Sequence, residues 1–255
     1  MNEARFYTPA DEGVKCLLCP HHCRIREGGR GLCRSRECRD GKLYALSYGR
    51  PCALAIDPVE KKPLNHFMPG TRCLSLSCTG CNLSCRWCQN SDISQAGPEE
   101  AESDEWSPEE IVDAALRRGL PSIAFTYTEP FTWWEYMYDI AAFAHDRDLK
   151  NILVSAGYVE REPLEELLPY LDAANIDIKA MEGRPRLRAA STISSGDHSS
   201  DSASSGPAWE MSLFWHHRQE RLQPVQLRER HRVPGMKWLR GFFSMGSMAR
   251  AQGLP

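Results

Sequence analysis

The sequence predicts an α/β protein built around about four parallel strands. Short apolar runs and amphipathic helices alternate along residues 73–178, and this alternation favours a parallel sheet with right-handed crossovers. Polar and charged side chains follow several of the predicted strands, at the positions where ligand sites lie in such sheets. The chain has 255 residues, of which 42% are hydrophobic and 25% charged, enough for one large domain with an appendage.

The elements of this domain are predicted in chain order. A strand at 73–77 precedes a cysteine-rich loop, and residues 91–104 are expected to form a second, acidic loop. A helix should begin at Ser107, since a serine cap, a proline and a glutamate three residues on form a start signal, and should end at Gly119. The further elements are a strand at 122–127, a helix at 133–145, a strand at 151–155, a helix at 163–171 and a strand at 174–178.

Charge divides the chain into segments. Residues 1–182 carry 20 Lys and Arg against 29 Asp and Glu, whereas residues 183–255 carry 11 against 5. We expect an N-terminal Cys-rich lobe and lead-in at 1–70, the parallel-strand domain at 71–182, and a low-complexity basic tail at 183–255. A serine-dense run opens this tail and cannot bury enough apolar surface to order itself, so the tail is predicted to be disordered or aberrant.

Two hypotheses account for the tail. Arginine almost replaces lysine there, with Lys237 the single lysine after Lys179, which fits a shifted reading frame of a GC-rich gene. The rival is a basic extension that binds a polyanion such as nucleic acid. The tail contains no dense basic cluster, so we favour the shifted frame and expect no nucleic-acid partner.

Composition also bears on location. No run of about 18 apolar residues occurs, so no membrane span is expected. The first residues lack the basic-then-apolar order of a signal peptide. Eleven cysteines without an export signal indicate metal or cluster ligation in a reducing compartment, and we expect a cytoplasmic protein.

The segment with the strongest chemical signal is the loop that holds Cys81, Cys85 and Cys88. Three thiolates from one loop can ligate a 4Fe–4S cluster, which takes one thiolate per iron, and leave one iron open to a small molecule. A structural zinc site would need a fourth ligand, and a disulfide would suit a secreted chain. The spacing therefore favours the cluster.

A second group of cysteines lies near the N-terminus, at Cys16, Cys19, Cys23 and Cys33. Glycines between the third and fourth of these let the backbone bring the thiols together, which makes them candidate ligands of a second metal. The alternative is four reduced cysteines in a small lobe. Zinc and an auxiliary iron–sulfur cluster both stay open, because thiolates suit either.

The cysteine loop resembles the signature of the radical S-adenosylmethionine (radical SAM) superfamily, whose three cysteines are spaced like these and whose last cysteine follows an aromatic residue. Further motifs resemble the AmmeMemoRadiSam-system branch, a relative of the pyruvate formate-lyase activating enzymes. These motifs are Cys19-Pro20-His21, Tyr48 to Leu54, Asp57 to Leu64 and Cys88-Gln89-Asn90. The resemblance covers about residues 14–181 and implies a partial parallel β/α barrel.

The resemblance also implies how the site works. In this superfamily the open iron chelates S-adenosylmethionine (SAM), and one electron from the cluster releases a 5′-deoxyadenosyl radical. Glu129 occupies the place of a motif that bonds the SAM amino group, and Trp87 is expected near the adenine. The alternatives are a solvated glutamate before a proline, and a tryptophan that shields the cluster from water.

Three residues at later strand ends complete the predicted site. Ser155 ends the third strand beside a glycine that allows close backbone approach to SAM. Asp177 and Lys179 share one face of the fourth strand. The resemblance places Asp177 near the SAM carboxylate and Lys179 toward the substrate, and an ion pair between the two is the alternative.

We therefore expect an enzyme that abstracts hydrogen from an unknown substrate. The kinship with glycyl-radical activating enzymes implies a protein glycine as substrate and an electron donor such as a flavodoxin or ferredoxin. The competing hypotheses are a non-catalytic iron–sulfur or zinc metalloprotein, and an inactive frameshifted fragment of the enzyme.

Overall fold

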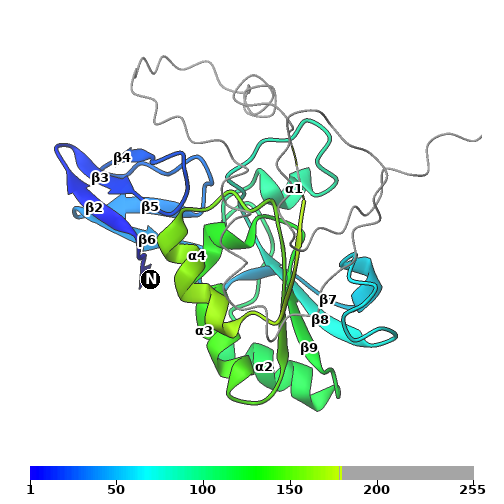
Figure 1. The fold of residues 1–255 in the computed structure, drawn as a ribbon. Helices are drawn as coiled ribbons and strands as arrows, with labels where there is room; N and C mark the ends of the chain where they lie inside the picture. The colour runs from blue at the N-terminus through cyan, green and yellow to red at the C-terminus, as the bar shows by residue number, and fades with distance from the viewer. Residues whose placement is uncertain (178, 180–255) are drawn as a thin grey trace, which may run out of the picture.

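The computed structural model describes residues 1–177 and Lys179. Its centre is a five-stranded sheet in the order β11-β10-β9-β8-β7 (Figure 1). Four neighbouring strands are parallel, which confirms the predicted α/β fold with four parallel strands. The parallel strands are β8 (Arg72–Cys78), β9 (Ser122–Phe125), β10 (Lys150–Ser155) and β11 (Ala173–Ile176). The tail predicted at 183–255 lies outside the described residues.

The fifth strand was not predicted. It is β7 (Pro51–Pro58), which pairs antiparallel with β8 at the edge of the sheet. The short helix η1 (Val59–Lys61) follows it. The sheet thus begins within the segment assigned to the lead-in, because the chain turns back after η1 and pairs the two strands side by side.

Helices connect the parallel strands and cover one face of the sheet (Figure 1). Ser107 caps α2 (Pro108–Arg117) and forms the predicted reciprocal bonds with Glu110. The remaining helices are η2 (Pro130–Trp133), α3 (Trp134–His145), α4 (Arg161–Leu167) and η3 (Leu168–Tyr170). None of the helices in the described part of the chain is both long and apolar enough to cross a membrane.

The prediction of a loop over residues 91–104 is wrong at its start. Residues Ser91–Ser94 form a one-turn helix, α1. The carbonyl of Asn90 accepts hydrogen bonds from the backbone N–H groups of Ile93 and Ser94. A single turn leaves no period in the sequence, so the pattern of residues 91–104 did not predict it.

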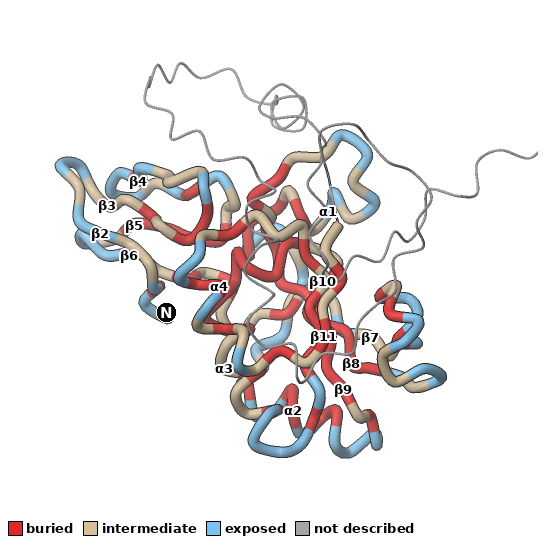
Figure 2. The backbone as a smooth tube through the Cα atoms, viewed as in Figure 1, coloured by how far each residue is buried: buried red, intermediate tan, exposed pale blue. Residues whose placement is uncertain are grey.

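The alternation of side chains along the strands gives the sheet two different faces. On the helix side, Leu76, Phe125 and Leu153 are fully buried and belong to the same core as the apolar face of α3. On the other side, a smaller cluster includes Cys73 and Ala124. Figure 2 shows β8, β9 and β10 as a largely buried centre.

An N-terminal lobe of two small antiparallel sheets packs beside this domain (Figure 1). One sheet has the order β2-β3-β4 and the other β1-β6-β5. The strands are β1 (Asn2–Glu3), β2 (Tyr7–Ala10), β3 (Gly13–Cys16), β4 (Arg24–Arg26), β5 (Arg36–Arg39) and β6 (Lys42–Ala45).

A buried ion pair fastens the lobe to the helices. The guanidinium of Arg36, whose residue is 1% exposed, donates from Nη2 to both carboxylate oxygens of Glu135 on α3, at 2.6 and 2.8 Å. The backbone N–H of Arg5 donates to the same carboxylate at 2.7 Å. A buried charge of this kind requires such a partner, so the lobe and α3 are packed in one arrangement.

Candidate functional site

The cysteine loop leaves the sheet at the carboxyl end of β8. A turn closed by a 3.2 Å hydrogen bond from the N–H of Cys88 to the carbonyl of Cys85 brings two of the three thiols together. Burial raises the pKa of Cys81, and the neighbouring charges of Glu129, Cys85 and Cys88 raise it further. The three thiols therefore lie within electrostatic reach of one another.

Contacts from other elements hold this loop in place. The side-chain amide of Asn90 donates to the carbonyl of Tyr127 at 2.9 Å, and that of Gln95 donates to the carbonyl of Leu83 at 2.9 Å. Asn82, between two of the cysteines, donates to the carbonyl of Tyr158 at 2.7 Å. The loop is thus shaped by protein contacts, as a preorganised ligand set should be.

The donor set of the loop fits a 4Fe–4S cluster with one open iron, because it supplies three thiols and no fourth ligand of its own. Among residues 1–177 and Lys179, no three His, Cys, Asp or Glu side chains stand in a geometry that holds a metal ion. Each cysteine turns about a single side-chain torsion with three staggered positions, so the direction of each thiol can change without a change of backbone.

Glu129 lies beside the loop and is 2% exposed. Its carboxylate accepts hydrogen bonds from the hydroxyl of Ser155 at 2.6 Å and from the N–H of Ala156 at 2.9 Å. Burial raises its pKa, and these hydrogen bonds partly oppose the shift. The alternative of a solvated glutamate is wrong, because the chain after β9 turns Glu129 inward onto the end of β10.

Asp177 and Lys179 lie at the same edge, just after β11. The ammonium of Lys179 contacts Oδ2 of Asp177 at 3.1 Å, and the amide of Asn175 donates to Oδ1 at 3.0 Å. Burial lowers the pKa of Lys179, but the charges of Asp177, Cys85 and Glu129 outweigh it and leave that pKa raised. Both residues lie beyond the last residue of β11, and the ion pair of the alternative is present.

Trp87 behaves differently from the other predicted residues. It is 69% exposed, so its ring makes little contact with the rest of the described chain. A ring in this position covers little of the loop and keeps an aromatic face free for stacking.

Comparison with known proteins agrees with this arrangement. Residues 76–194 match the model of the Radical SAM superfamily. The chain carries a radical SAM domain. An uncharacterised protein of Methanocaldococcus jannaschii is 50% identical over 180 residues, which cover 70% of this chain and 54% of that protein. The chain therefore spans about half the length of this relative.

The radical SAM domain includes the end of β8, the cysteine loop and all later strands of the sheet. The radical SAM domain over residues 76–194 implies a 4Fe–4S cluster and SAM as cofactors. The finer resemblance, to the activating enzymes of pyruvate formate-lyase, remains a prediction, since the relative is itself uncharacterised.

The edge of the sheet also contains a buried polar network that residue patterns did not predict. Asp57 on β7 accepts hydrogen bonds from Lys62 at 2.7 Å, from the more exposed Lys61 at 2.8 Å, and from the hydroxyl of Tyr127. Lys62 is 2% exposed. The signal was an aspartate followed by paired lysines. This network fixes Tyr127, which has a positive φ of 68°, and so shapes the turn that delivers Glu129.

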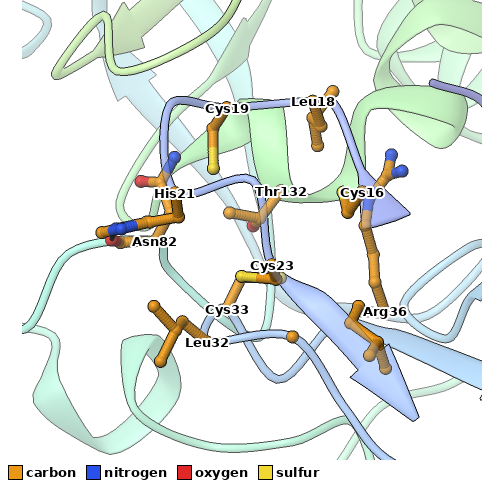
Figure 3. Close-up of a pocket in the computed structure, with 12 residues that line it drawn as sticks. Cys16, Leu18, Cys19, His21, Cys23, Leu32, Cys33, Arg36, Asn82 and Thr132 are labelled. Carbon is orange, nitrogen blue, oxygen red and sulfur yellow. Dashed lines mark hydrogen bonds between the residues drawn. The ribbon is translucent and has the colours of Figure 1, made fainter. Parts of the chain in front are cut away.

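The four N-terminal cysteines also come together. They line one cavity of about 20 Å³, with His21, Arg36 and Asn82 among its other lining residues (Figure 3). Asn82 belongs to the cysteine loop, and its carbonyl accepts a 2.7 Å hydrogen bond from Nε2 of His21. The lobe cavity and the predicted cluster site thus share a wall.

Proposed function

We propose that this protein is a radical SAM enzyme that cleaves SAM reductively. The observation that carries this proposal is that the candidate residues lie together at one edge of the sheet. There the three-thiol loop lies beside the buried Glu129–Ser155 pair and the Asp177–Lys179 pair. Carboxyl ends of parallel strands are where enzymes of related architecture hold their ligands.

In this proposal, Cys81, Cys85 and Cys88 hold the 4Fe–4S cluster, and the protein orients its ligands and limits water. With SAM bound, such a cluster supplies the electron that yields a 5′-deoxyadenosyl radical and methionine. Contacts around Asn90, Gln95 and Asn82 fix the loop, so its backbone would be in place before the cofactor arrives.

The remaining side chains would bind SAM. Glu129 accepts a charge-assisted hydrogen bond from the amino group, since its Oε2 accepts one bond from the described chain, from Ala156, and has a second lone pair. Ser155 orients that carboxylate. Asp177 faces the SAM carboxylate through a cation, Lys179 points toward the substrate, and Trp87 stacks on the adenine.

The substrate in this proposal is a C–H bond, and a protein glycine is the substrate class that the activating-enzyme resemblance implies. The cluster would take its electron from a flavodoxin or ferredoxin in the cytoplasm. Because the chain spans 54% of its relative, the substrate and partners of the whole protein belong to the proposal.

The experiment is anaerobic reconstitution of the full chain with iron and sulfide, followed by addition of SAM and dithionite. We expect 5′-deoxyadenosine, measured by chromatography and mass spectrometry, in amounts that grow with time. A reducible cluster without this product would contradict the proposal and favour a non-catalytic iron–sulfur protein.

Two cysteine variants make the test specific. Cys85→Ala removes a loop thiol, so it should lose both the cluster and the product. Cys52→Ala is the matched control, because the Cys52 thiol contacts the carbonyl of Ser77 near the carboxyl end of β8 but lies outside the loop. Equal loss in both variants would mean that the loop has no special role.

A further inference from the structure

The N-terminal lobe brings its four cysteines together through its backbone. The N–H of Cys16, the last residue of β3, donates to the carbonyl of Cys23 at 2.9 Å. Between them, a turn is closed by a 3.0 Å hydrogen bond from the N–H of His22 to the carbonyl of Cys19. Three of the thiols are therefore set around one tight hairpin end.

The fourth thiol reaches this hairpin through a glycine-rich turn. The N–H of Gly31 donates to the carbonyl of Arg36 at 2.9 Å, and this bond folds Cys33 back toward the other three. A side chain at position 31 would contact the Cys33 sulfur at 3.6 Å. Figure 3 shows the side chains of Cys19, Cys23 and Cys33 approaching the same space.

The cavity between these thiols is small. About 20 Å³ is room for roughly one or two water-sized bodies, which is enough for a single metal ion. Of the single ions that four thiolates bind, Zn²⁺ is held more tightly than Fe²⁺.

A buried hydrogen-bond donor at this cavity has no partner among the described residues and suits a thiolate site. It is Nε of Arg36, in a residue that is 1% exposed and lines the cavity. The Arg36 guanidinium also places positive charge next to sulfurs that would be negative as ligands, as groups around metal ligands commonly do.

His21 braces the wall between this cavity and the cysteine loop, because its Nε2 donates to the carbonyl of Asn82 at 2.7 Å. The four thiols alone have the composition of a closed structural zinc site.

We propose that Cys16, Cys19, Cys23 and Cys33 bind one zinc ion that stabilises the N-terminal lobe against the cysteine loop. The described side chains do not yet surround one point. Rotation about the single torsion of each cysteine brings the sulfurs inward, since all four already line the same cavity. The backbone bonds that set the hairpin stay intact in this step.

The test uses the full chain with Cys81→Ala, Cys85→Ala and Cys88→Ala combined, so that the loop cluster is absent and the outcome does not depend on the proposed activity. Protein purified from zinc-supplemented cells should contain about one zinc per chain and little iron by mass spectrometry. X-ray absorption at the zinc edge should give four sulfurs at about 2.3 Å.

Single replacements then locate the ion. In this background, Cys19→Ala or Cys23→Ala should lower zinc content at least about tenfold, because a three-thiolate site in a small lobe holds the metal weakly. Cys38→Ala is the matched control in the same lobe, since Cys38 is fully buried but does not line the cavity. It should keep its zinc.

Several results would overturn the proposal. About four irons per chain in the triple variant would mean an auxiliary cluster, and one iron with four sulfurs would mean a different ion. Zinc retained in Cys19→Ala and Cys23→Ala would place it elsewhere. If those variants fail to fold, the absorption spectrum of the triple variant still decides, because nitrogen or oxygen ligands contradict the site.

Discussion

The hydroxyl of Ser155, at the end of β10, donates a 2.6 Å hydrogen bond to Oε1 of the fully buried Glu129, which follows β9. This bond joins two neighbouring strands at the edge of the sheet where the cysteine loop also lies. A buried carboxylate held in this way is preorganised to accept a cation.

Replacement of Glu129 by Gln should weaken SAM binding about tenfold to a hundredfold, since a hydrogen bond to a charged group is worth about 1.5–3 kcal/mol. Iron content should stay unchanged, because the loop thiols are untouched. Titration of the reconstituted protein with SAM measures both. Wild-type affinity in the variant would show that Glu129 does not bind the amino group.

The pH dependence of SAM binding is a second test of whether Glu129 binds the SAM amino group. Burial raises the pKa of this carboxyl, and only its ionised form attracts the amino group. Affinity should therefore fall, as pH is lowered, at a higher pH than an ordinary glutamate pKa of about 4.3 would give. The Glu129→Gln variant should lack this step, and an identical profile in both proteins would contradict the assignment.

Asp57→Asn should lower the free energy of unfolding by about 3–5 kcal/mol at pH 7, because it leaves the ammonium of Lys62 buried without its charge partner. Chemical denaturation measures this change. Lys61→Met is the control: its side chain is 60% exposed, so the loss should be much smaller. Equal effects of the two substitutions would show that burial of Lys62 is not the cause.

The same network predicts an acid response. Burial alone would raise the pKa of Asp57, but hydrogen bonds from Lys61, Lys62 and Tyr127 outweigh it and lower that pKa. The stability that the ionised Asp57 contributes is therefore complete above the unfolded pKa of about 3.9 and is lost as pH falls toward the depressed folded value. The stability difference between wild type and Asp57→Asn should shrink over that acidic range and stay constant above it.

Glu135→Gln should also destabilise the protein by about 3–5 kcal/mol, because it leaves the buried guanidinium of Arg36 uncompensated. Thermal and chemical unfolding provide the measurement. Glu3→Gln serves as the control, since the Glu3–Lys42 pair is exposed and should leave stability within error. A tolerated Glu135→Gln would mean that the lobe is not held to α3 by this pair.

Trp87→Ala should leave the unfolding curve unchanged, because the ring is largely exposed. It should reduce SAM affinity if the ring stacks on the adenine, where an aromatic pair contributes about 0.5–1.5 kcal/mol. Parallel thermal melts and SAM titrations separate the two effects. Loss of stability without loss of affinity would contradict the assigned role.

The helices and strands of the domain were predictable where the signals are local. Ser107 and Glu110 form a capping box within four residues, and the apolar runs at 122–127 and 151–155 have strand length and flanks. The strands of the N-terminal lobe were not predictable, because they are two to four residues long and several are charged. From the sequence alone, Arg36 would be expected at the surface. It is buried because it pairs with Glu135, which lies far along the chain.

In the candidate site, too, the features with a local sequence signal were predictable and the long-range contacts were not. The spacing of Cys81, Cys85 and Cys88 and the positions of Glu129 and Asp177 after strands were visible in the sequence. The contacts of Asn82 with Tyr158 and of Tyr127 with Asp57 join elements that only the folded sheet brings together. Sequence patterns therefore located the reactive loop but not the residues that hold it in place.

The central claim is that the loop cluster has an open iron that binds SAM. Electron paramagnetic resonance of the reduced, reconstituted full chain tests it directly, with spectra recorded before and after addition of SAM. We predict that SAM changes the spectrum of the wild-type cluster and that Cys81→Ala, Cys85→Ala and Cys88→Ala each abolish this SAM-sensitive signal. A cluster spectrum that is identical with and without SAM, or one that persists in these variants, would contradict the claim.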